Sequence, residues 1–270
     1  MLKRTVNNDG IVADFFLPET EEKRKTIIML GGSEGGKSWS RINQVLSRLS
    51  ERGYNLLSTA YFKAAGLSAT LEEIPLERFE KLFSWLDQQP EVIPGHYALI
   101  GGSKGAELAL LLASRYPQIK AVAAISPSSV IWQGIPKNRF HLGRELKSSW
   151  SYQGVGIPYL PYLITRKDTR ALISLRLRKI HERALQHSGT AELNDASIPI
   201  EQAKAAIMLV SGAKDQMWPA AEMGEEIISR LHEKAYRFPY QHLQFNSGHN
   251  GLIMNRESWR QIFAFLGENF

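Results

Sequence analysis

Residues 97–115 read YALIGGSKGAELALLLASR, and this stretch decides the fold. The apolar residues before Gly101 are typical of a buried strand, and residues 106–115 have the composition of a helix. Between them, residues 101–105 match the pattern G-x-S-x-G. A sharp turn from strand to helix exposes a serine hydroxyl in this pattern, and small neighbours on both sides relieve the crowding. The stretch therefore predicts a nucleophile, Ser103, at the carboxyl end of a strand.

Short apolar runs recur along the rest of the chain. They are rich in Ile, Val and Leu, which suits strands covered on both faces, and they lie at 26–30, 55–60, 121–125 and 205–210. Amphipathic segments at 40–51 and 76–86 come between them. Such alternation predicts an α/β fold with a mostly parallel central sheet and helices on both faces. Asn8-Asp9-Gly10, between two short runs, predicts an antiparallel hairpin at one edge.

The chain has 270 residues, 43% of them hydrophobic, which suits one large α/β domain. One interval interrupts the alternation, because residues 127–199 show no clear strand and contain a helical stretch near 172–185. This interval is too long for an ordinary loop. We therefore expect a single domain over residues 1–270, with a cap inserted at about 128–199.

A serine hydroxyl is a poor nucleophile until a base takes its proton and a third group orients the base. In α/β-hydrolases the acid and then the histidine follow the serine along the chain. Asp215 directly follows an apolar run, so it belongs at the same edge of the sheet as Ser103. His249 lies in a glycine-bracketed loop, whereas His232 and His242 fall in a helix-like segment and a strand. The sequence thus predicts an α/β-hydrolase fold with the triad Ser103, Asp215 and His249.

A second glycine-rich turn, residues 31–38, reads GGSEGGKS and fits two motifs. It matches the phosphate-binding pattern G-x-x-x-x-G-K-[ST]. Such a loop needs a partner strand that ends in an aspartate to hold Mg²⁺, and no later strand ends in an acidic residue. In hydrolases the loop after the third strand instead supplies an N–H group to the oxyanion hole. We expect the backbone N–H groups of Ser33, Glu34 and Lys104 to bind the oxyanion, and nucleotide binding stays a remote alternative.

Composition narrows the classes of function. The absence of cysteine excludes disulfides, thiolate zinc sites and a cysteine nucleophile, and no feature of the sequence requires a metal or cofactor. The formal net charge is +6, and much of the excess lies in residues 166–183, where seven basic residues accompany two acidic ones. A solvated helix face is the usual explanation of such a run. Zinc-finger spacing and basic–aromatic RNA-binding signatures are lacking, so we expect no nucleic-acid partner.

Targeting signals are also lacking in the sequence. Residues 1–18 contain no apolar core of a signal peptide. No stretch reaches the roughly 18 apolar residues that a membrane span needs. We therefore expect a soluble, cytoplasmic protein.

From about Thr26 onward, the chain resembles the C-terminal catalytic domain of the acyl-CoA thioesterase and bile acid-CoA:amino acid N-acyltransferase family. The resemblance rests on GGSEGG at 31–36, AYF at 60–62, TLEEIPLE at 70–77, GSKGAE at 102–107, and the segment 211–219 with its DQMWP. It implies the same triad and cleavage of acyl-CoA to free acid and CoA. Because the amino-acid acyltransferases use a cysteine nucleophile, a serine at position 103 favours hydrolysis over transfer.

The resemblance also suggests a role for the basic run. Coenzyme A carries phosphates that Arg and Lys can hold, so we expect the run to contact CoA, with Arg176 and Arg178 as the candidate ligands. Two alternatives stay open. A carboxylesterase or a peptidase of the prolyl-oligopeptidase kind would have the same triad order, and a non-catalytic binding protein could keep the fold. Neither the acyl-chain length nor the oligomeric state follows from the sequence.

Overall fold

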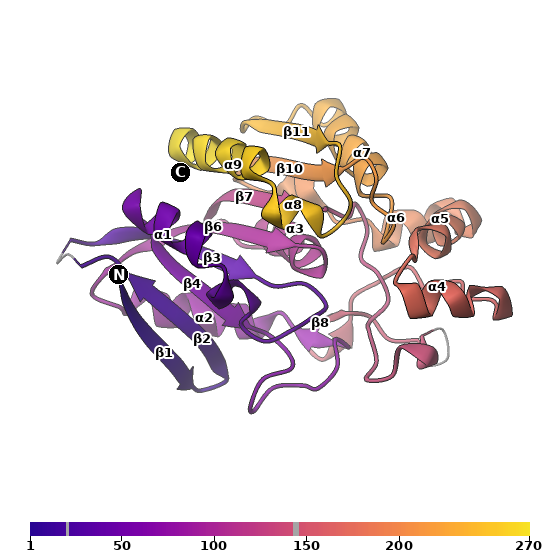
Figure 1. Ribbon diagram of the computed structural model, residues 1–270, viewed down its shortest axis with the longest axis horizontal. Coiled ribbons are helices and arrows are strands. Elements are labelled where there is room, and N and C mark those ends of the chain that lie inside the picture. The colour runs from indigo at the N-terminus through magenta and orange to yellow at the C-terminus, as the bar shows by residue number, and fades with distance from the viewer. Residues whose placement is uncertain (20–21, 143–145) are drawn as a thin grey trace.

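A computed structural model describes residues 1–19, 22–142 and 146–270, and in these residues one sheet of eight strands forms the centre of the molecule (Figure 1). Its strands are β1 (Leu2–Asn8), β2 (Ile11–Leu17), β3 (Arg24–Leu30), β4 (Asn55–Ala60), β6 (Val92–Gly102), β7 (Ile119–Ile125), β10 (Ala206–Gly212) and β11 (Tyr240–Phe245). Their order in space is β1-β2-β4-β3-β6-β7-β10-β11. The last six strands in this spatial order, from β4 to β11, pair in parallel. Strands β1 and β2 form the predicted antiparallel hairpin at one edge.

Helices cover both faces of the sheet, as predicted. On one face lie α2 (Glu77–Asp87), α3 (Lys104–Arg115) and α7 (Ala220–Glu233), and on the other lie α1 (Asn43–Glu51) and α9 (Arg256–Asn269). The strands are apolar on both sides because each face packs against a helical layer. Among the described residues, none of the helices has the length and apolar character needed to cross a membrane.

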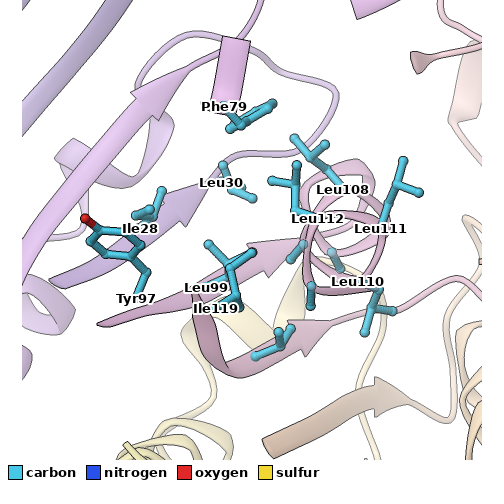
Figure 2. Close-up of a cluster of buried hydrophobic side chains, with 14 of the residues drawn as sticks. Ile28, Leu30, Phe79, Tyr97, Leu99, Leu108, Leu110, Leu111, Leu112 and Ile119 are labelled. Atoms are coloured by element: carbon cyan, nitrogen blue, oxygen red, sulfur yellow. The ribbon is translucent and has the colours of Figure 1, made fainter. Parts of the chain in front are cut away.

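Helix α3 is the most deeply buried of these helices. Its leucines 108, 110, 111 and 112 are at most 1% exposed, and they lie over β3 and β6, close to Ile28, Leu30 and Leu99 (Figure 2). A helix that is apolar all round needs cover on every side. The sheet provides that cover below α3, and the segment that follows β7 provides much of the rest.

That segment, residues 126–205 between β7 and β10, is called the cap here. It lies beyond the carboxyl ends of the central strands (Figure 1). Its described residues, 126–142 and 146–205, contain two short strands, β8 (Trp150–Tyr152) and β9 (Val155–Gly156), and three α-helices, α4 (Thr169–Ser174), α5 (Arg178–His187) and α6 (Thr190–Ala196). Strand β8 pairs with β9 and with β5 (Ile74–Pro75).

Two expectations for the cap were wrong in detail. The sequence indicated no strand in this interval, but β8 and β9 are present; they are too short to show a period-2 pattern. The helical stretch near 172–185 is two helices, because Leu175 adopts a left-handed φ of 55° between them. That conformation ends an α-helix.

The first turn of α3 lies directly on the end of β3. A Cβ atom at Gly105 would lie 2.2 Å from the carbonyl oxygen of Leu30 and 2.4 Å from that of Gly31. A Cβ atom at Gly101 would lie 2.1 Å from the carbonyl oxygen of Gly105. Backbone atoms cannot move aside as a flexible side chain can, so only glycine fits at 101 and 105.

Replacement of Gly105 by alanine should therefore destabilise the fold. We expect Gly105→Ala to lower the free energy of unfolding by about 3 kcal/mol, the upper part of the usual range for an overpacked core. Gly267→Ala is the matched control, because Gly267 lies in α9 with no atom near its missing Cβ. It should raise the free energy of unfolding by about 0.5–1 kcal/mol. Urea unfolding followed by circular dichroism measures both, and equal stability of the two variants would contradict the packing described.

Candidate active site

Ser103 occupies the sharp turn between β6 and α3. Its backbone has φ 56° and ψ −120°, a left-handed conformation that is strained for a residue with a side chain. The close approach of Gly101 and Gly105 imposes this turn, and a hydrogen bond of 2.9 Å from the Ser103 N–H to the Ile125 carbonyl oxygen holds it. The predicted nucleophile elbow is therefore present, with Ser103 lining two adjoining cavities.

The loops after β10 and β11 bring Asp215 and His249 together. Nδ1 of His249 lies 2.6 Å from Oδ2 of Asp215, which is fully buried. The other oxygen of Asp215 accepts the N–H groups of Met217, at 2.7 Å, and Trp218, at 3.3 Å. A carboxylate beside Nδ1 fixes the proton on that nitrogen and leaves Nε2 free to accept one. His249 and Ser103 line the same cavity, of about 420 Å³, so the structure gathers all three predicted residues.

The glycine-rich loop after β3 lies against the elbow. The Tyr61 hydroxyl donates to the carbonyl oxygen of Gly31, and the N–H of Gly32 donates to the Glu34 carboxylate at 2.8 Å. In the described part of the chain, the N–H groups of Ser33 and Glu34 have no acceptor. Ser33 lines both of the cavities that Ser103 lines. The loop is thus held in place while its N–H groups stay free.

Lys104 supplies the other expected oxyanion donor. Its N–H belongs to the first turn of α3 and so has no acceptor within the helix. The helix dipole adds partial positive charge at this end. The predicted donors therefore lie on the two sides of the elbow, next to Ser103.

The phosphate-binding alternative for the same loop receives no support. The ammonium group of Lys37 lies 2.5 Å from Oδ1 of buried Asp14, in an ion pair. The chain then enters a short 3-10 helix, η1 (Ser38–Arg41), instead of the α-helix that a phosphate-binding loop precedes. The ammonium group of Lys37 is therefore already paired with a carboxylate and is not free to bind a phosphate.

The larger cavity, of about 1070 Å³, lies between Ser103 and the cap. Polar groups such as Lys63, Glu72 and Lys137 contribute to its wall, but apolar side chains dominate it: Ile135, Pro136, Phe140, Leu142, Tyr162, Ile164, Leu172, Leu175, Leu177, Ile180, Met217 and Trp218. His181 also lines it, and burial lowers the pKa of His181 to about 4, so this side chain is neutral at pH 7. A concave, mainly apolar wall of this kind suits an acyl chain.

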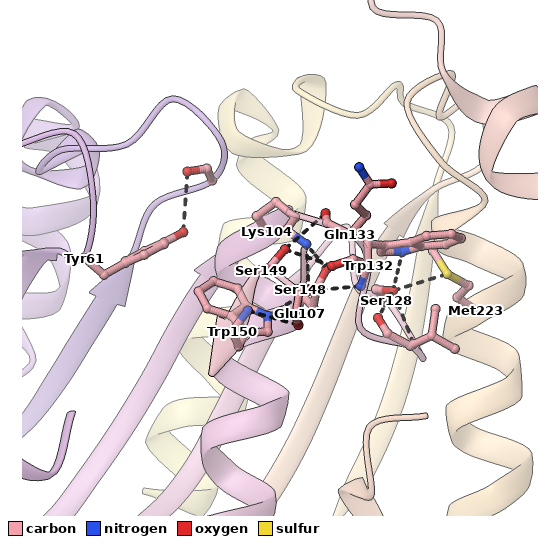
Figure 3. Close-up of polar contacts among 12 residues, drawn as sticks. Tyr61, Lys104, Glu107, Ser128, Trp132, Gln133, Ser148, Ser149, Trp150 and Met223 are labelled. Atoms are coloured by element: carbon pink, nitrogen blue, oxygen red, sulfur yellow. Dashed lines mark hydrogen bonds and ion pairs between the residues drawn. The ribbon is translucent and has the colours of Figure 1, made fainter. Parts of the chain in front are cut away.

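A buried ion pair joins the elbow to the cap (Figure 3). Nζ of Lys104 lies 2.7 Å from both carboxylate oxygens of Glu107, and the two side chains are 2% and 0% exposed. Oε1 of Glu107 also accepts Nε1–H of Trp150 at 2.8 Å and the backbone N–H of Trp132 at 3.3 Å. Burial lowers the pKa of Lys104 and raises that of Glu107, and their attraction opposes both shifts.

From the sequence we predict a role only for the backbone N–H of Lys104, and the ion pair of its side chain with Glu107 is not among the predictions. The spacing of three residues was visible, but most such pairs on helices are exposed. Burial of the pair arises from Trp132 and Trp150, which are distant in sequence. The pair therefore could not be recognised without the tertiary structure.

The structure treats the two candidate CoA ligands differently. The Arg178 guanidinium donates to the carboxylates of Glu182 and Glu222 and, at 3.3 Å, to the backbone carbonyl of Asp215. This arrangement holds the loop that carries Asp215, and Arg178 lines neither cavity near Ser103. Arg176 is exposed and also lines neither. The phosphate-binding role of Arg176 stays a prediction, whereas the contacts of Arg178 point to a structural role.

The segment of residues 70–77, for which the sequence indicated no chemical role, binds the cap through backbone hydrogen bonds. The N–H of Leu71 donates to the Ile135 carbonyl at 3.0 Å, and the N–H of Glu73 donates to the Ser148 carbonyl at 2.8 Å. Thr70 and Glu72 line the large cavity. This segment therefore shapes the cavity and does not take part in the triad.

Removal of one partner of the buried ion pair should be costly. Lys104→Met leaves the Glu107 carboxylate buried without its cation, so we expect a loss of about 3–5 kcal/mol in the free energy of unfolding. The double variant Lys104→Met/Glu107→Gln keeps an acceptor for the two tryptophans without a charge, and it should recover most of that loss. Urea unfolding of the complete cycle tests this, and additive losses would contradict the account.

Comparison with solved structures bears on the fold. The esterase Pf2001 from Pyrococcus furiosus superposes with a TM-score of 0.60 at 17% sequence identity, covering 99% of this chain and 91% of that one. At this identity the likeness shows the fold alone. It confirms the predicted α/β-hydrolase fold.

Comparison of sequences bears on the family. Human acyl-coenzyme A thioesterase 1 is 28% identical over 230 residues, covering 83% of this chain and 48% of that protein. Mouse acyl-coenzyme A thioesterase 5 is 26% identical over 229 residues, with 84% and 48% covered. The chain thus spans about half the length of these curated relatives. Residues 74–252, more than half of the chain, match the model of one family. The chain therefore belongs to the family of BAAT / acyl-CoA thioester hydrolase C-terminal domains.

Proposed function

We propose that this protein is a serine hydrolase that cleaves acyl-CoA to a free acid and CoA through an acyl-enzyme on Ser103. The observation that carries the proposal is the 2.6 Å contact between Nδ1 of His249 and buried Asp215. His249 lines the smaller cavity, and Ser103 lines the same cavity. The apolar cavity of about 1070 Å³ on the other side of Ser103 supports an acyl substrate. The thioester class is supported by the family and by the thioesterases that the chain resembles.

In the proposed acylation, Oγ of Ser103 attacks the thioester carbonyl carbon while Nε2 of His249 takes the hydroxyl proton. Asp215 holds the proton on Nδ1 and stabilises the imidazolium that forms. The carbonyl oxygen becomes an oxyanion, which accepts hydrogen bonds from the N–H of Lys104 and from the turn of Ser33 and Glu34. These donors are in place before the reaction, so binding of the oxyanion requires little reorganisation.

The intermediate then collapses. The carbon–sulfur bond breaks, and the CoA sulfur leaves with the proton that His249 received. A water molecule next gives its proton to His249 and attacks the acyl ester. The second collapse releases the carboxylic acid and returns the proton to Ser103.

A second candidate is an esterase with the same triad. It has the same support from the site, because neither the turn at Ser103 nor the contact between His249 and Asp215 is specific for a thioester. The same elbow and oxyanion donors would cleave an oxygen ester. A peptidase of the prolyl-oligopeptidase kind, with the same order of triad residues, is a further enzymatic alternative. Comparison of kcat/KM for acyl-CoA, p-nitrophenyl esters and aminoacyl anilides separates the three.

The direct test is the release of CoA thiol from a panel of acyl-CoA esters. We expect turnover by the wild type and a decrease of about three orders of magnitude or more in Ser103→Ala, the scale of losing a triad member. Ser50→Ala, in the last turn of α1, is the control and should keep full activity. Absence of turnover with every acyl-CoA, together with Ser103-dependent cleavage of p-nitrophenyl esters, would reject the thioesterase in favour of the esterase.

A further inference from the structure

The two cavities that meet at Ser103 differ in one decisive residue. His249 lines the smaller cavity and does not line the larger one. The sulfur that leaves must take its proton from His249, so the leaving group has to lie on the His249 side. If the proposed function holds, the acyl chain occupies the large apolar cavity, and the pantetheine arm of CoA runs through the smaller one.

The smaller cavity extends to the residues that lead into α1 and α9. On one wall, Ile42 directly precedes α1, and on the other, Ile253 lies in α8 (Gly251–Met254), just before α9. Figure 1 shows α1, α8 and α9 on the same side of the sheet. Arg48 and Arg256 line the groove between α1 and α9.

A row of packed aromatic side chains connects the smaller cavity with this groove. Trp39 lines the smaller cavity, and its ring packs edge-on against Trp259 with centroids 5.8 Å apart. Trp259 in turn contacts Phe263 at 5.6 Å. Phe263 lines the groove between α1 and α9, which is a third cavity of about 570 Å³. The smaller cavity and the third cavity therefore lie along one packed row of rings.

The third cavity is strongly basic. Four arginines line it against a single acid, Glu257: Arg48 in α1, Arg52 directly after α1, and Arg256 and Arg260 in α9. Nε and Nη2 of Arg260 donate to the Glu257 carboxylate, at 2.8 and 2.6 Å. Among the described residues, Arg48, Arg52 and Arg256 have no acidic partner. Three guanidinium groups thus remain available to an anion.

Two contacts fix the orientation of the Arg52 guanidinium. Its guanidinium lies over the Phe263 ring, 4.7 Å from the centroid, and donates to the backbone carbonyl of Arg48 at 2.7 Å. A guanidinium that is stacked and oriented in this way loses less conformational freedom when it binds a phosphate. Arg48 lies six residues after Ile42, about 9 Å along the axis of α1 at the usual helical rise. In the proposed complex, the pantetheine arm spans this distance from the smaller cavity at Ile42 to Arg48.

We propose that the groove between α1 and α9 is the site of the CoA phosphates, held by Arg48, Arg52 and Arg256. This inference rests on the proposed thioesterase function and replaces the cap as the expected phosphate site. Arg176 lines none of the three cavities, and Arg178 is already paired with the carboxylates of Glu182 and Glu222. Several arginines that converge on one cavity, beyond the leaving-group side of the triad, match the multiple phosphates of CoA.

The test compares thioesters that share one acyl group but differ in phosphates: acyl-CoA, acyl-dephospho-CoA and acyl-pantetheine. In Arg48→Ala/Arg256→Ala we expect KM for acyl-CoA to rise about tenfold or more, since charge-assisted contacts to phosphate are lost. Its kcat should change little, and KM for acyl-pantetheine should stay constant. Arg48→Lys/Arg256→Lys should recover part of the affinity. Arg237→Ala, an exposed arginine that lines none of these cavities, is the control.

The outcomes separate this inference from the function on which it rests. Equal shifts of KM for acyl-CoA and acyl-pantetheine would overturn the phosphate site while leaving the thioesterase intact. A selective rise of KM for acyl-CoA in Arg176→Ala, and not in the groove variant, would return the phosphates to the cap. Failure of the wild type to cleave any of the three thioesters would reject the thioesterase and the groove site together.

Discussion

The close contact between the first turn of α3 and the end of β3 is the constraint on which the site depends. Because Gly105 lies against the backbone of Leu30 and Gly31, no side chain fits there, and the chain has to turn sharply at Ser103. The same contact places the N–H of Lys104 beside the loop that carries Ser33. Elbow and oxyanion donors are thus consequences of one packing arrangement. The buried leucines of α3 keep that arrangement rigid.

The cap is coupled to the triad as well as covering it. The ion pair of Lys104 and Glu107 ties the elbow to Trp132 and Trp150, and Arg178 ties the cap to the loop of Asp215. A buried charge with a poor partner is expensive, so these contacts favour one position of the cap. The large cavity between them therefore has a defined wall. This explains why residues without direct chemical roles, such as those at 70–77, matter to the site.

Much of this arrangement could be predicted from the sequence, for local reasons. Apolar runs and amphipathic segments predicted the sheet and its two helical layers, and the order of Ser103, Asp215 and His249 along the chain predicted three residues that the structure brings together. What escaped prediction depends on partners distant in sequence. Strands β8 and β9 are too short for a pattern, and the charge run in the cap did not reveal that Arg178 already has carboxylate partners. The arginines between α1 and α9 come from opposite ends of the chain, so only the fold brings them together.

The central claim is that the acyl group passes through Ser103. The most direct measurement is mass spectrometry of the wild-type protein quenched in acid during turnover of an acyl-CoA, followed by peptide mapping. We expect a protein heavier by the acyl group, with the added mass on the peptide that contains Ser103. Turnover without any covalent adduct, or an adduct on a different residue, would contradict it.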